Sequence, residues 1–226
     1  MFNVAHYAAP AHSMFSLLDS LSHTVLDGET GCVRYFPDCV PSALAQVWFE
    51  TLRDGVAWSS FRRMMYEREV DVPRLIATFD LDAADLPEPI RDARAVVERL
   101  SEHAYNSVGV NRYRDGNDSV APHNDRLDDL VRGAPIALLS LGCTRRLTMT
   151  TKAAPRRHLH LDLEPGSLLV MSYDTQLHFD HGVPKTRAPV GERISLAFRD
   201  RPRTRDSDAW SGGPRRRKYI AKAPGT

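Results

Sequence analysis

The sequence has few cysteines and no long apolar run, and each absence excludes a class of protein. Its three cysteines, Cys32, Cys39 and Cys143, are an odd number and form no CxxC pair. We therefore expect reduced thiols, with a Cys32–Cys39 bridge as the alternative. No run approaches the ~18 apolar residues that a membrane-spanning helix needs, and the N-terminus lacks the basic start and compact apolar stretch of a signal peptide. These features predict a cytoplasmic protein with no membrane partner.

An excess of one charge sign is also absent, because the formal net charge is only +1. The basic residues are nevertheless uneven: the run RRRKY at 215–219 follows Trp210 near the C-terminus. Basic clusters interleaved with aromatic residues suit a polyanion such as nucleic acid, and a solvated tail is the other interpretation. At 42% hydrophobic and 26% charged residues, the chain is typical of one globular domain with extensions, which we expect to be monomeric.

The apolar pattern changes from helical to strand-like along the chain. SALAQVWFETLRDG, after Pro41, and PEPIRDARAVVERLSEHA, at 87–104, have apolar residues at helical spacing and predict two helices. From Asn106 onward, short runs bounded by Gly, Pro, Asn or Asp predict strands: SVGVNRYR, APIALLSLGC, RRLTMTT, HLHLDLE, GSLLVMSY and RISLAFR. This is an α+β, mainly β, chain with an irregular extension at 1–40, helical support at 41–104, a β-sandwich core at 105–201 and a basic tail at 202–226.

The segment APHNDRLDDL contains the first half of a possible metal site. His123 and Asp125 are two positions apart, so an extended backbone directs both side chains to one side. A histidine from another strand would complete a set of two imidazoles and one carboxylate, which suits non-haem Fe(II) with open positions. The histidines of HLHLDLE alternate with leucine and are expected to face solvent. His181 is the better third ligand, and His178 stays open as its rival.

Two arginines at the ends of RISLAFR indicate an anionic ligand. Arg193 and Arg199 fall on one face of the strand together with Ser195, and a buried guanidinium is costly without an anion. Asn111 and Tyr113, upstream, are also same-side neighbours that could donate to a carboxylate. In the alternative interpretation the arginines lie in water at strand ends, or pair with one of three acidic residues, Asp162, Asp180 or Glu192.

Taken in order, these motifs resemble those of one family. NSVGVNRYRDGNDSVAPHND, IALLSLGCTRRL, GSLLVMSYDTQLHFDHGVPK and RISLAFR are similar to the AlkB family of Fe(II)- and 2-oxoglutarate-dependent dioxygenases, which remove alkyl groups from nucleobases in DNA or RNA. The match runs from about Asn106 to Arg201, with a looser similarity in YEREVDVPRLIATF. The resemblance implies a double-stranded β-helix, or jelly roll, supported by the N-terminal helices.

The resemblance also implies the residues of the site. It assigns Fe(II) to His123, Asp125 and His181, which makes His178 the less favoured ligand. It implies that 2-oxoglutarate, which is consumed together with O2, is held by five residues: Asn111, Tyr113, Arg193, Ser195 and Arg199. Arg193 is expected at the distal carboxylate and Arg199 nearer the keto-acid end. The segment from Trp58 to Phe79 is expected to form part of a lid over the substrate.

The substrate side departs from the family pattern. Ser195 stands where asparagine is usual, and Leu127 stands where the family often has a carboxylate that recognises a flipped base. Asp128 or Asp129 is the candidate to replace that carboxylate. The family's aromatic position is Thr78, so the neighbouring Phe79 is expected to stack on the base. The predicted substrate-binding residues are Trp58, Arg74, Phe79, Leu127 and Asp128, with Arg62 and Arg63 as further phosphate contacts. For Trp58, packing in the core is an equal alternative.

The sequence thus predicts an oxidative dealkylase of N-alkylated nucleobases. Its partner would be single-stranded nucleic acid or a base flipped out of a duplex. A second hypothesis keeps the same machinery but gives it a protein or a small metabolite as substrate. A third is a non-catalytic module that binds iron or 2-oxoglutarate.

Overall fold

The computed structural model describes residues 22–65 and 68–203. These residues form two β-sheets, three α-helices and one short 3-10 helix, η1 (Leu127–Asp129). The helices are α2 (Ser42–Gly55), α3 (Glu88–Ser101) and α4 (Thr175–His178). The strands are β1 (His23–Gly28), β2 (Gly31–Phe36), β3 (Ser59–Met65), β4 (Arg68–Asp80), β5 (Ser107–Tyr113), β6 (Val120–His123), β7 (Ile136–Gly142), β8 (Arg145–Thr151), β9 (His158–Leu163), β10 (Leu168–Met171), β11 (Phe179–Val183) and β12 (Arg193–Arg199).

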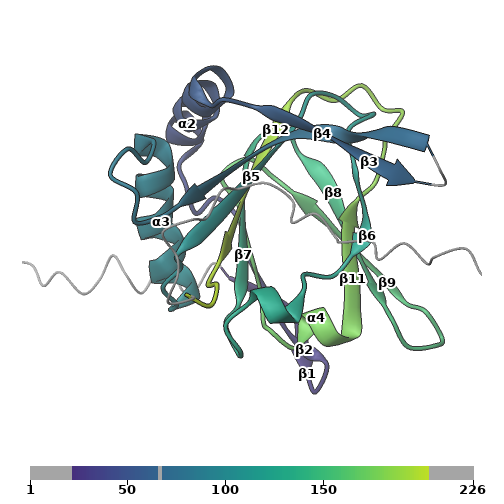
Figure 1. The fold of residues 1–226 in the computed structure, drawn as a ribbon. Helices are drawn as coiled ribbons and strands as arrows, with labels where there is room; N and C mark the ends of the chain where they lie inside the picture. The colour runs from purple at the N-terminus through teal and green to yellow at the C-terminus, as the bar shows by residue number, and fades with distance from the viewer. Residues whose placement is uncertain (1–21, 66–67, 204–226) are drawn as a thin grey trace, which may run out of the picture.

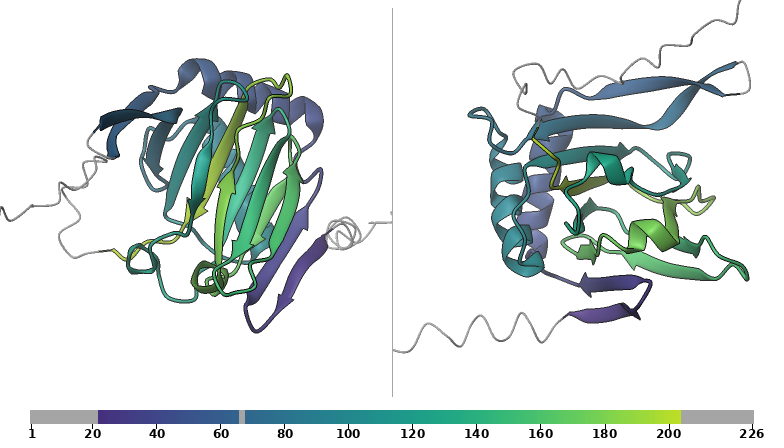
Figure 2. Two further views of the ribbon diagram at one scale, coloured as in Figure 1. Left: turned by 90° about the vertical axis from the view of Figure 1, so that its right-hand side faces the viewer. Right: turned by 60° about the horizontal axis from the view of Figure 1, so that its bottom comes forward.

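The two sheets lie face to face as a sandwich. The larger sheet has the order β1-β2-β10-β7-β12-β5-β4-β3, and the smaller has the order β6-β11-β8-β9. Helices α2 and α3 cover the outer face of the larger sheet (Figures 1 and 2), while the smaller sheet covers its inner face. The molecule is therefore mainly β, with the two helices on one side. Among the described residues, no helix is long and apolar enough to span a membrane.

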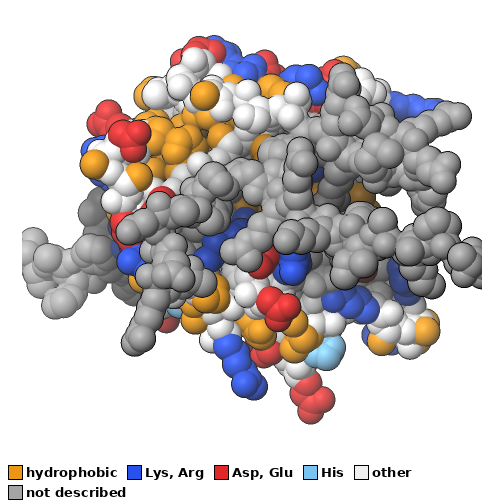
Figure 3. All heavy atoms as spheres, in the orientation of Figure 1, with side chains coloured by type: hydrophobic (Ala, Val, Ile, Leu, Met, Phe, Trp, Pro, Cys, Tyr) orange, Lys and Arg blue, Asp and Glu red, His pale blue; other side chains and the backbone are white. Residues whose placement is uncertain are grey.

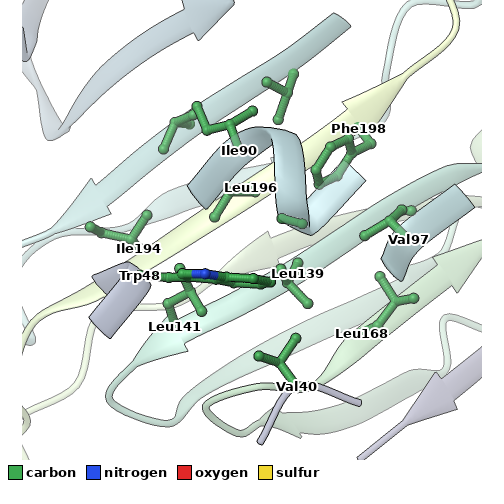
Figure 4. Close-up of a cluster of buried hydrophobic side chains, with 14 of the residues drawn as sticks. Val40, Trp48, Ile90, Val97, Leu139, Leu141, Leu168, Ile194, Leu196 and Phe198 are labelled. Atoms are coloured by element: carbon green, nitrogen blue, oxygen red, sulfur yellow. The ribbon is translucent and has the colours of Figure 1, made fainter. Parts of the chain in front are cut away.

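Each face of the larger sheet has its own apolar core. On the outer face, Trp48 of α2 and Ile90 and Val97 of α3 pack on Leu139 and Leu196 of the sheet (Figure 4). Both helices present apolar residues at helical spacing, as the sequence predicted, and bury them on one side. Figure 3 shows hydrophobic side chains gathered near these helices and mixed charges elsewhere on the visible face. The core between the sheets instead surrounds a cavity.

The second core determines the position of the inward-facing polar side chains. Ile136, Leu138, Met149 and Met171 belong to the cluster between the sheets, together with Tyr113. Because successive side chains of a strand alternate between faces, the polar residues on the same rows as these apolar ones also point inward. All six strands that the sequence predicted are present, as β5, β7, β8, β9, β10 and β12.

The expectation of an irregular segment before residue 41 is wrong for its described part. β1 and β2 form an antiparallel hairpin, and β2 pairs with β10, so the hairpin extends the larger sheet. Val33 and Phe36 of β2 are buried in the two cores. Each strand of the hairpin is short, so apolar and polar residues alternate over only a few positions and the sequence pattern is weak. The hairpin is stabilised mainly by its pairing with the edge of the larger sheet.

The region at 41–104 is also less helical than expected. β3 and β4 form a hairpin between the two helices, and β4 continues the larger sheet beyond β5. The predicted basic tail lies outside the described residues beyond 203. The side chains of Arg62 and Arg63 lie outside the described part as well. The three cysteines are free thiols, and burial raises the pKa of Cys39 to about 12.

Candidate functional site

A cavity of about 330 Å³ opens between the two sheets. Its walls come from β4, β5, β7 and β12 on one side and from β6, β8 and β11 on the other. The predicted site residues that line it are Arg74, Asn111, Tyr113, His123, Asp125, His181, Arg193, Ser195 and Arg199. The fold therefore brings together side chains that lie up to 125 positions apart, the separation of residues 74 and 199. The volume is at the low end for small-molecule sites.

Two imidazoles face each other on one wall of this cavity. β6 and β11 pair so that His123 and His181 are directly opposite, and their ring centroids are 4.6 Å apart. His123 is exposed, with its Nδ1 3.0 Å from the carbonyl oxygen of Ala121, whereas His181 is buried. Burial and then the neighbouring His123 lower the pKa of His181 to about 3. His181 is therefore neutral, which is the form that binds a metal ion.

Asp125 places an ionised carboxylate next to the two histidines. Burial raises the pKa of this carboxyl, but the charge and hydrogen bonds of Arg199, together with His181 and His123, outweigh burial, and the net pKa is lowered. Nε and Nη2 of Arg199 donate to the two carboxylate oxygens, each at 3.0 Å. Among the described residues, no three His, Cys, Asp or Glu side chains form a ready-made metal-binding group. The two imidazoles and the carboxylate nevertheless match the donor types that non-haem Fe(II) takes.

Arg193 supplies an unpaired positive charge at the same cavity. Its side chain is 1% exposed, and Nη2 donates to Ser140 Oγ at 2.8 Å. Nε and Nη1 have no hydrogen-bond partner among the described residues. Burial lowers the pKa of Arg193, and the neighbouring Tyr113 opposes this shift. A buried guanidinium with two free donors is expensive by itself and well suited to a bidentate carboxylate.

The strand β12 shows the predicted alternation. Arg193, Ser195 and Arg199 all line the cavity, and Ser195 pairs in register with Asn111. The Oδ1 atom of Asn111 accepts a hydrogen bond from Arg74 Nε at 2.8 Å. The alternative partners proposed for the two arginines are wrong, because Asp162 pairs with Arg146 and Glu192 pairs with Arg112, while Asp180 makes no ion pair within the described residues.

The structure contradicts the predicted stacking role of Phe79, and for Trp58 it shows the alternative, packing in the core. Phe79 packs against the helix-side core, and its neighbour Thr78 lines the cavity instead. Trp58 also packs against that core, and its Nε1 donates to the carbonyl oxygen of Arg53. Arg112 is half-buried, with its guanidinium 5.8 Å from the Trp58 ring. Both aromatic side chains thus stabilise the fold on the face opposite the cavity.

The remaining substrate candidates lie beside the cavity without lining it. Leu127 and Asp128 belong to η1, which follows directly after the segment of His123 and Asp125. Leu127 is half-buried and Asp128 is exposed, and neither is among the residues of the cavity wall. In this structure no carboxylate of η1 reaches the cavity.

The other histidines are placed as the sequence suggested. His178 ends α4 and is exposed outside the cavity wall. His158 and His160 lie on the exposed face of β9, where their Nδ1 atoms bond the hydroxyls of Thr150 and Thr148. Their rings are stacked with centroids 6.2 Å apart.

Sequence reasoning missed three polar residues that support the site. Arg145 is buried and donates to the carbonyl oxygens of Asp115, Asp118 and Pro184. Its inward orientation was readable, because it alternates in step with the buried Leu147 and Met149 of β8. Gln176 and Ser140 gave no such signal, since their partners are distant in the sequence.

Comparison with known proteins identifies the class to which this site belongs. A family model described as the 2OG-Fe(II) oxygenase superfamily matches residues 80–199. The chain therefore belongs to the 2OG-Fe(II) oxygenase superfamily. The metal and co-substrates of this class are Fe(II), 2-oxoglutarate and O2.

Curated relatives narrow the class to AlkB-like proteins, as the motifs indicated. The human protein named DNA oxidative demethylase ALKBH2 is 34% identical over 118 residues, which cover 46% of this chain and 45% of the relative. Human alpha-ketoglutarate-dependent dioxygenase alkB homolog 3 is 34% identical over 190 residues, which cover 74% of this chain and 65% of the relative. The chain spans about half the length of the ALKBH2 relatives from cattle, human and mouse.

Solved structures confirm the double-stranded β-helix. The structure of OsALKBH1 has a TM-score of 0.55 at 13% identity and covers 74% of this chain and 97% of its own. A prolyl-4-hydroxylase from Pseudomonas putida has a TM-score of 0.52 at 19% identity, and the match covers 84% of this chain and 100% of the hydroxylase. At such low identity the likeness concerns the fold alone.

Proposed function

We propose that this chain is an Fe(II)- and 2-oxoglutarate-dependent dioxygenase that oxidatively removes alkyl groups from N-alkylated nucleobases. The observation that carries the proposal is the pairing of two features in one cavity. Arg193 presents two unpaired, buried donors, and His123, Asp125 and His181 present two imidazoles and a carboxylate. A dicarboxylate and a divalent metal ion together would satisfy both features.

The residues of the cavity divide into two groups in this proposal. His123, Asp125 and His181 hold Fe(II), and Asn111, Tyr113, Ser195 and the two arginines hold 2-oxoglutarate. Arg193 binds the distal carboxylate with its free donors, while Arg199, bonded to Asp125, lies nearer the metal end. When bound, Fe(II) supplies the oxidising chemistry through its open coordination positions. The protein supplies the orientation of the metal ligands and of the co-substrate.

The nucleobase enters from the side of β4 in this proposal. Arg74 and Thr78 of β4 line the cavity, and the exposed His123 offers its ring as a stacking surface. The base is taken from a single strand or flipped from a duplex, which costs a few kcal/mol and least for a damaged base. The relatives named DNA oxidative demethylase support DNA as the substrate. A monomer in the cytoplasm belongs to the same proposal.

A second candidate function is oxidation of a protein side chain or a small metabolite by the same machinery. One set of observations favours it: Phe79 and Trp58 face the core, and η1 directs no carboxylate into the cavity. The groups expected to recognise a base are thus fewer than in the family pattern. The difference between the two candidates lies only in the substrate.

Mass spectrometry of methylated oligonucleotides tests the proposal. The full chain would be incubated with Fe(II), 2-oxoglutarate, O2 and single-stranded DNA that carries 1-methyladenine or 3-methylcytosine. Loss of the methyl group with the unsubstituted protein, and not with His123→Ala, is the expected result. Succinate without methyl loss would favour the second candidate. The absence of both products would contradict the dioxygenase itself.

A further inference from the structure

Gln176 connects α4 to the loop that carries Asp125. Its side chain is 1% exposed and lies outside the cavity wall, so it does not contact the space available to a ligand. Its Oε1 atom accepts a hydrogen bond from the backbone N–H of Asp125 at 3.0 Å, across 51 positions of the sequence. The side chain of Gln176 thus acts on the backbone of Asp125, while Arg199 acts on the carboxylate.

The N–H of Asp125 needs this partner because the strand has already ended. β6 ends at His123, which is paired with His181 of β11. Beyond this pair the sheet provides no further acceptor, and Asp125 is half-buried. An unbonded buried amide is unfavourable. A side-chain amide reaching from α4 therefore replaces the missing strand partner and fixes the direction in which the chain leaves β6.

Gln176 is itself held in one orientation by a chain of hydrogen bonds. Its Nε2 donates to Thr175 Oγ1 at 3.1 Å, and this hydroxyl donates to the carbonyl oxygen of Ser172 at 2.6 Å. Ser172 bonds Cys32 twice: Cys32 N donates to Ser172 Oγ, and Ser172 N donates to the carbonyl oxygen of Cys32. The hydrogen bonds that hold the glutamine amide thus connect, through Ser172, to the β1–β2 hairpin, which lies outside the region matched by the family model.

Lys152 fixes the backbone at the same position. Its Nζ donates to the carbonyl oxygen of Gln176 at 2.7 Å, so both the main chain and the side chain of this residue are held. α4 leads directly into β11, the strand of His181. The short helix α4 is thus bonded to the loop of Asp125 through Gln176, and it continues directly into the strand of His181.

We propose that Gln176 is a positioning residue for the iron-binding carboxylate of Asp125. The inference rests on the proposed function, since it needs Asp125 to be a metal ligand. A metal ion that takes a carboxylate oxygen competes with Arg199 for it, whereas the hydrogen bond of Gln176 to the amide of Asp125 does not compete with the metal. Gln176 thereby keeps Asp125 opposite the two histidines whether or not the carboxylate is bonded to Arg199.

Titration of the full chain with Mn(II), followed calorimetrically, tests this inference without enzyme turnover. Gln176→Ala removes the acceptor, and Gln176→Glu keeps an acceptor oxygen at the same distance. The Ala variant is expected to bind Mn(II) about 10–100-fold more weakly than the unsubstituted protein, the range for residues that orient metal ligands. The Glu variant is expected to restore most of the affinity, because the N–H of Asp125 regains its partner.

Two further variants separate positioning from general stability. Ser101→Ala removes a buried side-chain hydrogen bond within α3, where Ser101 Oγ donates to the carbonyl oxygen of Val97. Its affinity for Mn(II) is expected to be unchanged at a comparable loss of thermal stability. Thr175→Val leaves Gln176 in place but removes the hydroxyl that orients its amide, and it serves where Gln176→Ala fails to fold. A several-fold weaker affinity is expected for it, about tenfold at most.

The outcomes distinguish this inference from the proposed function. If the unsubstituted protein binds no Mn(II), the metal site is wrong and the inference falls with it. If the unsubstituted protein binds Mn(II) and Gln176→Ala binds it equally well, the metal site stands and the positioning role is wrong. Equal weakness of the Ala and Glu variants would also overturn the role, because the acceptor would then not be the decisive group.

Discussion

The guanidinium of Arg193 lies over the ring of Tyr113, with 5.2 Å between its Cζ atom and the ring centroid. Arg145 lies over the same ring at 5.5 Å. Neither guanidinium takes part in an ion pair within the described residues. The two differ in their hydrogen bonds: Arg145 donates to three carbonyl oxygens, whereas Arg193 keeps two donors without a partner.

Removal of the unpaired charge is expected to stabilise the protein and abolish co-substrate binding. In Arg193→Met a buried guanidinium with two unsatisfied donors is replaced by an apolar side chain of similar length. The free energy of unfolding without ligands is expected to rise by about 1–3 kcal/mol. The increase in unfolding temperature that 2-oxoglutarate produces with Mn(II) is expected to disappear. Thermal unfolding with and without both ligands measures the two effects.

Arg145→Met is the matched control for this experiment. It removes an equally buried arginine whose donors are bonded, so three carbonyl oxygens lose their partner. We expect this variant to be destabilised. A loss of stability in Arg193→Met, with the response to 2-oxoglutarate retained, would contradict the assignment of Arg193 to the anion.

Regular strands are the part of the site that the sequence predicted well. In β12, period-two alternation alone placed Arg193, Ser195 and Arg199 on one face, and all three line the cavity. The same rule, applied consistently, would have prevented an error on β4. Arg74 and Phe79 are five positions apart and so face opposite sides of a strand, whereas Arg74 and Thr78 share a side.

Contacts between distant segments could not be predicted. The register that sets His123 opposite His181 depends on how β6 and β11 pair, and neither short strand has a distinctive pattern. The hydrogen bond from Asp125 to Gln176 depends on the position of α4, which the chain reaches after four further strands. Trp58 was ambiguous because an aromatic residue suits a core and a stacking surface equally well.

Adjacent residues of β4 are expected to have opposite effects when substituted. Phe79→Ala removes packing from the helix-side core and should lower the free energy of unfolding by about 1–3 kcal/mol, less than for a fully buried phenylalanine. Its activity on methylated DNA at low temperature should be nearly unchanged. Thr78→Ala should leave stability unchanged and alter KM for the oligonucleotide, because Thr78 lines the cavity. Urea unfolding and steady-state kinetics of both variants test the pair, and a selective KM effect in Phe79→Ala would contradict the orientation of β4.

Asp118 is expected to make stability depend on pH in the acid range. Burial raises the pKa of its carboxyl, but three hydrogen bonds from Arg114 outweigh this and the net pKa is lowered. A lowered pKa in the folded state stabilises the protein above the unfolded-state value of about 3.9, and this stabilisation is lost as the pH falls through the lower folded value. Asp118→Asn should therefore lower the free energy of unfolding by about 1–3 kcal/mol at neutral pH.

The difference between Asp118→Asn and the unsubstituted protein should shrink at acid pH. Urea unfolding at neutral pH and at about pH 3 measures it, within the window set by the carboxyl pKa. Asp115→Asn, in the exposed part of the same loop, is the control and should change stability by less than about 0.5 kcal/mol. A difference that is the same at both pH values would show that the carboxylate charge of Asp118 is not responsible.

Gly182 allows β6 and β11 to approach each other next to the histidine pair. A Cβ atom at this position would lie 2.7 Å from the carbonyl oxygen of Val120 and 3.1 Å from the carbonyl carbon of Ala121. Both are backbone atoms of β6. Gly182→Ala must therefore push β6 away and move His123 relative to His181. We expect Mn(II) affinity to fall by about tenfold or more, as when a metal ligand is poorly oriented.

Gly55→Ala provides the comparison for Gly182→Ala, because a Cβ atom at Gly55 meets nothing within 4 Å. This exposed residue ends α2, so alanine there should leave Mn(II) affinity unchanged and alter stability by no more than about 1 kcal/mol. Calorimetric titration of both variants with Mn(II) separates a local steric effect from a general one. Since Gly182 contributes no side chain to the cavity, a loss of affinity in Gly182→Ala alone would locate the metal between β6 and β11. Unchanged affinity would mean that the metal does not need both histidines at their present separation.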